Sequence, residues 1–310
     1  MLQKILKIKS YLKYKYNVYR DRVKHLQKLR TLNLPIFIDG HPDSKNFGDG
    51  LNIFLGEYLS GKDVFPSKFI KDTEYKNDIS YSVIGSVCQW SREKTVVWGS
   101  GFIKESYQDG SFVKPQKVAA VRGPLTRKIY LANGVECPEI YGDPALLMPL
   151  IYNPHLEIPR YEYGIIPHYT EADSDWVKKQ RKNANVLFID IMIESDYQKF
   201  ISQIKSCKKI VTSSLHGLIL SHAYQIPVSH ISLSDKLTGG DFKFNDYLLS
   251  VNKAPKKPYQ ITANSIPIDS LEFDSEPLKI NIRPLINACP FIKTQIKEKL
   301  LKQSVYYEGS

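Results

Sequence analysis

The stretch from residue 210 to residue 227, IVTSSLHGLILSHAYQIP, combines residue types that could bind an anion and transfer a proton. The pattern predicts a short buried strand, a Thr-Ser-Ser turn and a helix that begins at about Leu215. A strand that runs into a helix N-terminus directs backbone N–H groups and the positive end of the helix dipole at one point. An ordinary strand–helix unit with a capping serine and a half-buried histidine would show the same pattern. The candidate residues here are Ser213, Ser214, His216 and Gly217.

Three further polar residues follow other predicted strands, at the turns where open α/β sheets bind their ligands. Arg122 comes after the strand predicted over 117–121, and its guanidinium could pair with a phosphate or carboxylate, or form a surface salt bridge. Asp143 stands before a proline and is either a helix N-cap or a catalytic carboxylate. His168 ends a strand predicted over 164–167 and is a second candidate for an anion site.

Two glycine-containing loops complete the set. The loop after the first predicted strand, 34–39, leads into a helix predicted over 51–59 and carries polar residues that could face a ligand, although Asp49 could instead cap that helix. The strand predicted over 95–98 ends in a Gly-Ser-Gly turn, where glycines allow close approach of the backbone to a ligand. The candidate residues of these loops are Asn46, Gly48, Asp49, Gly99 and Gly101.

Alternating strands and helices must position these residues, and a proline-containing segment divides them into two groups. This order predicts an α/β protein with two Rossmann-like domains facing each other across a cleft, as in GT-B folds, preceded by a basic N-terminal helix. All the candidate turns follow strands, so they would line the cleft. The expected boundaries are a leader at 1–30, a first domain at 31–152, a linker at 153–163, a second domain at 164–253, and an irregular tail with a closing helix at 254–310.

Composition is that of a folded protein, with 42% hydrophobic and 24% charged residues in a chain of 310. No apolar run is long enough to span a membrane, and lysines interrupt the N-terminus where a secretory signal needs an apolar core. The four cysteines fit no metal or redox spacing. We therefore expect a cytoplasmic protein.

Positive charge is concentrated in residues 1–30, which hold ten Lys or Arg and one acidic residue, while the whole chain has a net charge of +11. The rest of the chain, after residue 30, is nearly neutral, which argues against a nucleic-acid-binding protein. Apolar residues of the leader recur at helical spacing, so this segment either lies on the inner face of an anionic membrane or packs on the body as a solvated helix.

Several motifs, taken together and in order, resemble the polysaccharide pyruvyl transferase family. One departure is Ser214, because many family members carry an arginine at this position, although a subset also reads S-S-L-H-G. The motifs are N-F-G-D at 46–49, V-V-W-G-S-G-F at 96–102, V-R-G-P-L-T at 121–126, Y-G-D-P-A-L-L at 141–147, I-I-P-H-Y at 165–169, T-S-S-L-H-G at 212–217 and K-F-N-D-Y-L at 243–248.

The resemblance implies phosphoenolpyruvate as the donor substrate, bound on the side of the second domain, with no cofactor. It implies an acceptor sugar on the first domain, part of a cell-surface polysaccharide or its lipid-linked precursor, and a cyclic pyruvate ketal as product. His216 and His168 would share acid catalysis and phosphate binding, and Asp143 or Asp49 would accept the hydroxyl proton. No metal-ligand cluster is visible, so we expect a metal-independent enzyme.

Two other functions fit parts of the sequence. A glycosyltransferase of the same architecture would also place a helix N-terminus against the phosphates of a nucleotide sugar, with Glu194 as the candidate for the ribose hydroxyls. A non-catalytic sugar-binding scaffold would tolerate substitutions in the cleft and depend mainly on the basic leader.

Overall fold

The computed structural model describes residues 20, 22–42, 44–155, 158–193, 196–234, 239–263 and 266–304. Most of the predicted leader, 1–30, therefore lies outside the described residues, as does Glu194; residues 22–29 form a helix. No helix in the described part of the chain is long and apolar enough to cross a membrane.

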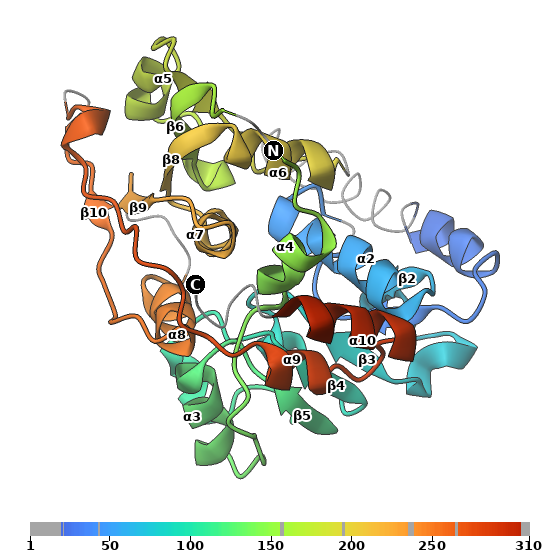
Figure 1. Ribbon diagram of the computed structural model, residues 1–310. Coiled ribbons are helices and arrows are strands. Elements are labelled where there is room, and N and C mark those ends of the chain that lie inside the picture. The colour runs from blue at the N-terminus through green and yellow to red at the C-terminus, as the bar shows by residue number, and fades with distance from the viewer. Residues whose placement is uncertain are drawn as a thin grey trace, which may run out of the picture.

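Two five-stranded sheets, each entirely parallel, confirm the predicted α/β fold and are consistent with two Rossmann-like domains (Figure 1). The first sheet has the order β2-β1-β3-β4-β5 and the second β10-β9-β8-β6-β7. Their strands are β1 Ile36–Ile38, β2 Val64–Pro66, β3 Ser80–Ser82, β4 Thr95–Trp98, β5 Lys117–Ala120, β6 Tyr161–Ile166, β7 Val186–Phe188, β8 Cys207–Thr212, β9 Val228–Ser232 and β10 Tyr259–Gln260.

Helices cover these sheets and connect their strands, as crossovers between parallel strands require. α7 is buried along its whole length, which explains why its sequence is apolar on every side. The helices are α2 Phe47–Ser60, α3 Pro124–Ala132, α4 Met148–Ile151, α5 Asp175–Gln180, α6 Tyr197–Lys205, α7 Leu215–Ala223, α8 Phe242–Ser250, α9 Arg283–Asn287 and α10 Thr294–Gln303, with short 3₁₀ turns that include η5 Pro144–Leu147 and η6 Tyr169–Glu171.

Strand register places the candidate loops beside each other. β6 and β8 pair Ile166 with Thr212, so the residues that follow both strands lie side by side. β1 and β3 pair Ile38 with Tyr81 and bring the loops that follow them together at the carboxyl edge of the first sheet.

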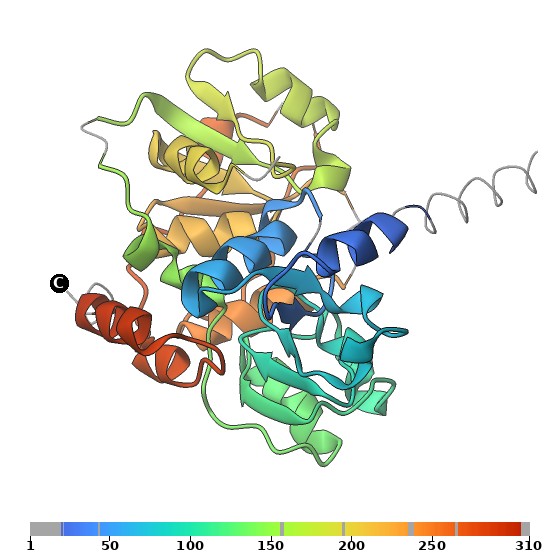
Figure 2. The same cartoon turned by 90° about the vertical axis from the view of Figure 1, so that its right-hand side faces the viewer.

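The C-terminal segment returns to the first sheet, where α9 and α10 pack against it (Figures 1 and 2). The indole of Trp98, which is fully buried, donates a hydrogen bond of 2.9 Å to the carbonyl of Leu285. The ring of Phe291 lies edge-on to Tyr81 and Trp98, at 4.9 and 5.6 Å between centroids. Pro290 predicts a break in the closing helix, and the structure has this break between α9 and α10.

The edges of the sheets differ from the sequence prediction. β2 and β10 were not expected, because one ends in a proline and the other has only two residues, and both pair on one side only. The apolar residues before Gly142 predict a strand over 139–141, but the structure has only a single bridge there, between Val121 and Tyr141. β6 begins at Tyr161, inside the segment expected to be a linker, and the proposed domain boundaries stay a prediction.

Candidate active site

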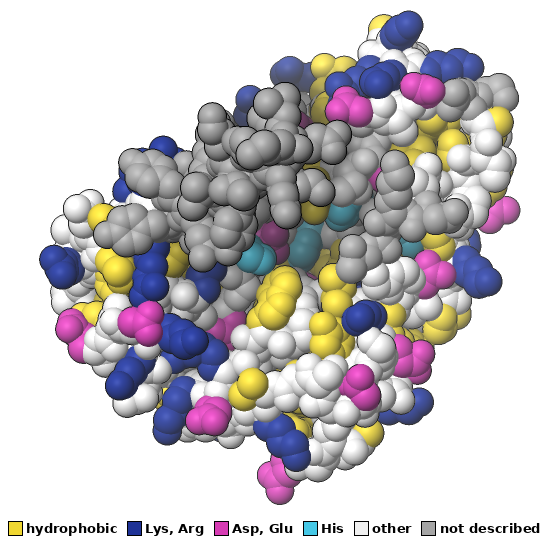
Figure 3. All heavy atoms as spheres, turned by 180° about the vertical axis from the view of Figure 1, so that it is seen from behind, with side chains coloured by type: hydrophobic (Ala, Val, Ile, Leu, Met, Phe, Trp, Pro, Cys, Tyr) yellow, Lys and Arg dark blue, Asp and Glu magenta, His cyan; other side chains and the backbone are white. Residues whose placement is uncertain are grey.

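A pocket of about 370 Å³ lies between the carboxyl edges of the two sheets. Histidine side chains gather in a hollow near the middle of the molecule in Figure 3. Loops after β1 and β3 line the pocket from the first sheet, and loops after β6 and β8 line it from the second. Of the sequence candidates, the structure brings together here Asn46, Asp49, His168, Ser214 and His216.

His216 joins this pocket to the buried carboxylate of Asp143. It lies in the first turn of α7, and its Nε2 is 3.9 Å from Oδ2 of Asp143. Neither atom has a hydrogen-bond partner among the described residues. The other carboxylate oxygen of Asp143 accepts a hydrogen bond from the Ala145 amide and caps η5. Asp143 is therefore both a cap and a partner of the histidine, and the two readings of its sequence position are compatible.

Burial favours the neutral forms of both members of this pair. It raises the pKa of the Asp143 carboxyl to about 7. It lowers the pKa of His216 to about 3, and the positive charges of Arg122 and Lys243 act in the same direction. Over the range between these values the pair holds one titratable proton.

Gly48, a candidate ligand-binding glycine, contacts the ring of His216 instead. A Cβ atom at this position would lie 1.9 Å from Nδ1 of the imidazole. Asn46 caps α2 by accepting a hydrogen bond of 3.0 Å from the Gly48 amide. The first turn of α2, which follows β1 of the first sheet, thus packs against the ring of His216. The same turn places Asp49 in the lining of the pocket.

The N-terminus of α7 opens into the pocket without a side-chain cap. Ser214 occupies the N-cap position, makes no capping hydrogen bond and lines the pocket. The first N–H groups of a helix have no partner within it, so they can bind an anion here. The hydroxyl of Ser213 accepts a hydrogen bond of 2.9 Å from the His168 amide and links the two loops rather than lining the pocket.

His168 lies at the mouth of the same pocket, after β6. Its Nδ1 is 2.7 Å from the hydroxyl of Thr170, and its ring is tilted against Tyr169. Burial lowers its pKa to about 4, with a further contribution from the charge of Lys243. The neutral ring can therefore donate or accept one hydrogen bond to a ligand at neutral pH.

Lys243 is a pocket residue that sequence reasoning missed. It belongs to α8, lines the pocket, and has only 9% of its surface exposed. Burial lowers its pKa to about 8, with the charge of Arg122 acting in the same direction and the charges of Asp49 and Glu171 in the opposite one. Lys243 thus carries a positive charge at neutral pH. The K-F-N-D-Y-L motif at 243–248 was the available signal, but nothing in the sequence alone directed its first residue to the pocket.

Arg122 lies behind the pocket and does not line it. Its guanidinium is fully buried and pairs with Asp246 of α8, with Nε 3.0 Å from Oδ2. It also donates hydrogen bonds to the Ser86 hydroxyl and the Phe102 carbonyl, each of 2.7 Å. Ser86 lines the pocket, so Arg122 positions it from behind. Direct contact of Arg122 with a substrate stays a prediction and would require a rearrangement of this network.

Three other candidate glycines make room for protein atoms, not for a ligand. A Cβ at Gly99, whose φ is +86°, would lie 2.3 Å from Cδ of Pro144. At Gly101 it would lie 2.5 Å from the Arg122 guanidinium, and at Gly217 2.3 Å from the Thr212 hydroxyl. None of the three lines the pocket.

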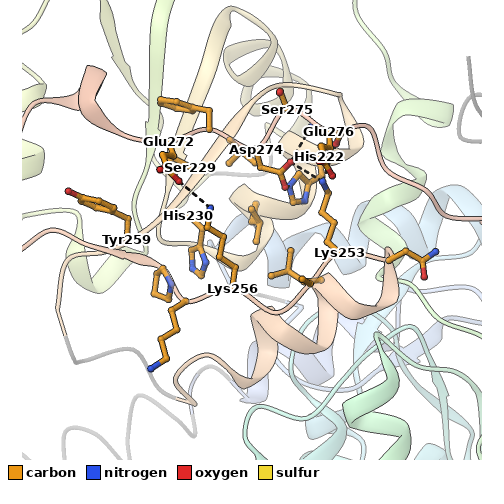
Figure 4. Close-up of a pocket in the computed structure, with 18 of the residues that line it drawn as sticks. His222, Ser229, His230, Lys253, Lys256, Tyr259, Glu272, Asp274, Ser275 and Glu276 are labelled. Carbon is orange, nitrogen blue, oxygen red and sulfur yellow. Dashed lines mark hydrogen bonds and ion pairs between the residues drawn. The ribbon is translucent and has the colours of Figure 1, made fainter.

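A larger cavity, of about 770 Å³, lies toward the other end of α7 (Figure 4). Its main charged groups neutralise each other. Asp274 lies 3.3 Å from His222 Nε2 and 2.9 Å from Lys253 Nζ. None of the residues that line it also lines the pocket of about 370 Å³, so the two cavities are distinct.

No group of three or more His, Cys, Asp or Glu side chains within the described ranges is arranged to hold a metal ion. The four cysteines are buried free thiols. Burial raises the pKa of the Cys88 thiol to about 11, so it is not activated as a nucleophile.

Two parallel sheets with a polar pocket between their carboxyl edges place the chain among α/β proteins of two Rossmann-like domains. Within this class, the chain belongs to the polysaccharide pyruvyl transferase family, whose family model matches residues 10–235. The pocket residues after β1, β3, β6 and β8 all lie within that match.

Two relatives cover most of the chain. An uncharacterized protein of Acanthamoeba polyphaga mimivirus is 33% identical over 224 residues, which are 71% of this chain and 76% of the relative. The succinoglycan biosynthesis protein ExoV of Rhizobium meliloti (strain 1021) is 28% identical over 220 residues, which are 68% of this chain and 64% of ExoV. No solved structure matches the chain significantly.

Proposed function

We propose that this protein transfers a pyruvyl group from phosphoenolpyruvate to a sugar of a cell-surface polysaccharide or its lipid-linked precursor, forming a cyclic ketal. Membership of the family supports the reaction. The observation that carries the proposal is the pair formed by His216 and Asp143, whose facing atoms lack hydrogen-bond partners beside the open N-terminus of α7. This arrangement offers a proton and an anion site in the same pocket.

The donor brings a phosphate and a carboxylate. The phosphate would bind the first N–H groups of α7 and the ammonium of Lys243, and the carboxylate would receive a hydrogen bond from His168. Many family members carry an arginine where this chain has Ser214. In this chain Lys243 lies in the same pocket as Ser214 and supplies a positive charge there.

The pair of His216 and Asp143 would deliver the proton that starts the reaction. The proton adds to the methylene carbon of phosphoenolpyruvate and leaves an oxocarbenium-like centre at its second carbon, which the first sugar hydroxyl attacks. The bond to phosphate then breaks, and a second hydroxyl forms the other bond of the ketal. Asp143 is fully buried, so it acts through His216, which alone of the two lines the pocket. Asp49 also lines the pocket and is placed to accept a hydroxyl proton.

Calorimetry with phosphoenolpyruvate and with a panel of nucleotide sugars tests this proposal, together with release of phosphate in the presence of candidate sugars. We expect wild-type protein to bind phosphoenolpyruvate and His216→Ala to lose turnover by about 10²- to 10⁴-fold, the usual contribution of a general acid or base. His155→Ala is the matched control, because this histidine is exposed and outside the pocket. Full turnover in His216→Ala would refute the catalytic role.

The alternative is a glycosyltransferase that uses a nucleotide sugar. The N-terminus of α7, where Ser214 makes no capping hydrogen bond, would bind the diphosphate of a nucleotide sugar as readily as a single phosphate. Binding of a nucleotide sugar without any response to phosphoenolpyruvate would establish this function instead. A pocket that binds neither, and that tolerates substitution of His216 and Lys243, would indicate a sugar-binding scaffold. Contact of residues 1–30 with a membrane surface also stays a prediction.

A further inference from the structure

A second cavity, of about 500 Å³, adjoins the candidate active site on the side of the first sheet. His41 and Trp90 line both cavities, so they form a shared wall. Their rings meet edge to face, with 5.1 Å between centroids. The two cavities therefore adjoin at these two side chains.

Positive charge dominates this second cavity, which we call the basic pocket. The described residues that line it include no carboxylate. The nearby Asp39 is buried beneath it and accepts hydrogen bonds from the hydroxyls of Ser67, Ser82 and Thr95. Like charges gathered in one place repel each other and attract an anion. The cations of the basic pocket are Lys68, Lys71, Lys76 and Arg92.

The guanidinium of Arg92, which lines this pocket, has an N–H donor that could bind an anion. Its Nη2 donates to the Lys76 carbonyl, which fixes the guanidinium. Its Nη1 is buried and has no hydrogen-bond partner in the described part of the chain. A buried donor without a partner costs free energy that a bound anion would recover.

Trp90 provides a flat surface at the junction of the two cavities. It is 49% exposed, which is unusual for the largest apolar side chain. An aromatic ring of this kind can contact the apolar face of a sugar while the sugar hydroxyls remain free to react.

We propose that the basic pocket binds a phosphate or diphosphate group carried by the acceptor, with the adjoining sugar ring on Trp90 and its hydroxyls directed into the active site. The proposal rests on the proposed function, because it names the chemical class of the acceptor. No carboxylate among the described residues that line the pocket offsets the charge of Lys71, Lys76 and Arg92, and an anionic group on the acceptor would do so.

The helix at 22–29 packs on the segment that forms one wall of the basic pocket. The ring of His25 stacks on Phe69 at 4.1 Å, and Arg22 pairs with Asp72 at 2.5 Å. Phe69 and Asp72 are sequence neighbours of the pocket residues Lys68 and Lys71. Residues 22–29, which belong to the basic leader, therefore lie beside this pocket. A phosphate group on a lipid and one on a soluble sugar share the same chemistry, and the experiments below distinguish them.

Calorimetry with inorganic diphosphate, in the presence of saturating phosphoenolpyruvate, tests the pocket directly. We expect a second binding event that weakens by at least about tenfold in the double variant Lys71→Gln/Lys76→Gln, because hydrogen bonds to charged groups are lost. Lys128→Gln is the matched control, since Lys128 is exposed on α3 and lines none of these cavities. Equal binding by the double variant and wild type, or no binding by wild type, would overturn the proposal.

The same titration without phosphoenolpyruvate separates the two proposals. If the protein does not bind phosphoenolpyruvate, the pyruvyl transferase function fails, yet diphosphate binding that depends on Lys71 and Lys76 would still establish the basic pocket. If phosphoenolpyruvate binds and diphosphate binding does not depend on these lysines, only the acceptor proposal fails.

The contribution of Trp90 is measured with glucose 1-phosphate and galactose 1-phosphate against the free sugars. We expect at least one sugar phosphate to bind at least about tenfold more tightly than its free sugar, and Trp90→Ala to weaken that binding more than Trp90→Phe does. Equal affinity for charged and uncharged sugars would contradict an anionic acceptor.

Sedimentation with phosphatidylcholine vesicles identifies the source of the phosphate. Vesicles that contain a diphosphate ester of a long-chain alcohol should retain wild-type protein but not the double variant if the acceptor is lipid-linked. Binding of sugar phosphate in solution without retention on these vesicles would support a soluble acceptor. The absence of both would refute the proposal.

Discussion

Gly48 contacts the imidazole of His216 across the interface between the two sheets, with no room for a Cβ atom between them. His216 is therefore held from two sides, by the main chain of α2 and by the facing carboxylate of Asp143. Its orientation depends on both halves of the molecule being in place. A change at either contact should alter chemistry before it alters donor binding.

Gly48→Ala should displace the ring of His216, because the new methyl group would overlap it. We expect turnover to fall by about 10²-fold or more, with a loss of about 1–3 kcal/mol in the free energy of unfolding. Phosphate-release assays and denaturant unfolding measure the two effects. Gly134→Ala is a useful control, because its φ of +67° predicts a stability loss, yet no atom lies within 4 Å of the added Cβ. Unchanged turnover in Gly48→Ala would contradict the role of this contact.

Asp143→Asn should steepen the dependence of stability on pH. Between about pH 4 and 6 the native pair of Asp143 and His216 holds one proton, as judged from pKa values of about 7 and 3. The unfolded chain also holds one proton on these two residues, on the histidine, so the wild-type pair contributes almost no slope. In the variant the native state holds none, and acidification should cost about 1.4 kcal/mol per pH unit more than in wild type.

Urea unfolding of both proteins at several values between pH 4 and pH 6 measures this difference in slope. Parallel curves would show that His216 gains a proton in the folded variant, which would contradict its burial in a neutral form. His155→Ala provides the control, since this histidine is exposed.

Lys243→Met should weaken binding of phosphoenolpyruvate by about 10- to 100-fold, because a charge-assisted hydrogen bond is lost. Wild-type affinity should also fall as the pH rises above about 8, where the lysine loses its proton, and this pH dependence should be absent in the variant. Calorimetry from pH 6.5 to 9.5 measures both effects. Lys199→Met, an exposed lysine of α6, serves as the control. A wild-type affinity that stays constant through pH 9 would exclude a charged Lys243 as the phosphate ligand.

Arg122→Met tests whether this arginine binds the donor or supports the site from behind. Removing one member of a buried ion pair leaves Asp246 uncompensated and should cost about 3–5 kcal/mol of stability. Arg122→Met/Asp246→Leu should recover much of that loss if the role is structural. Thermal and denaturant unfolding measure the losses. A variant that remains stable but binds phosphoenolpyruvate weakly would instead support direct contact, as the sequence position suggested.

The sequence predicts much of the site because several of its residues follow strands directly. His168 comes directly after one predicted strand and His216 follows another after a short turn, and parallel pairing brings such turns to one edge. The sequence also predicts a helix from Pro124 to about Ala132, from the proline at its start and Gly134 after its end, and the structure confirms it.

Residues whose role depends on distant segments could not be predicted. Arg122 is buried because Asp246, 124 positions later, reaches it from α8. Gly101 is required by the Arg122 side chain, and Gly48 by a histidine of the other sheet. Lys243 reaches the pocket only because α8 packs near α3, a long-range contact for which local periodicity gives no signal.

The return of the C-terminal helices to the first sheet has a consequence for synthesis on the ribosome. The indole N–H of Trp98 donates its hydrogen bond to the carbonyl of Leu285, which is translated 187 residues later. Until α9 and α10 leave the exit tunnel, the rings of Tyr81 and Trp98 lack their cover from Phe291. The first half of the chain therefore emerges with an apolar surface exposed, and the nascent protein should be a client for chaperones that bind such surfaces during translation.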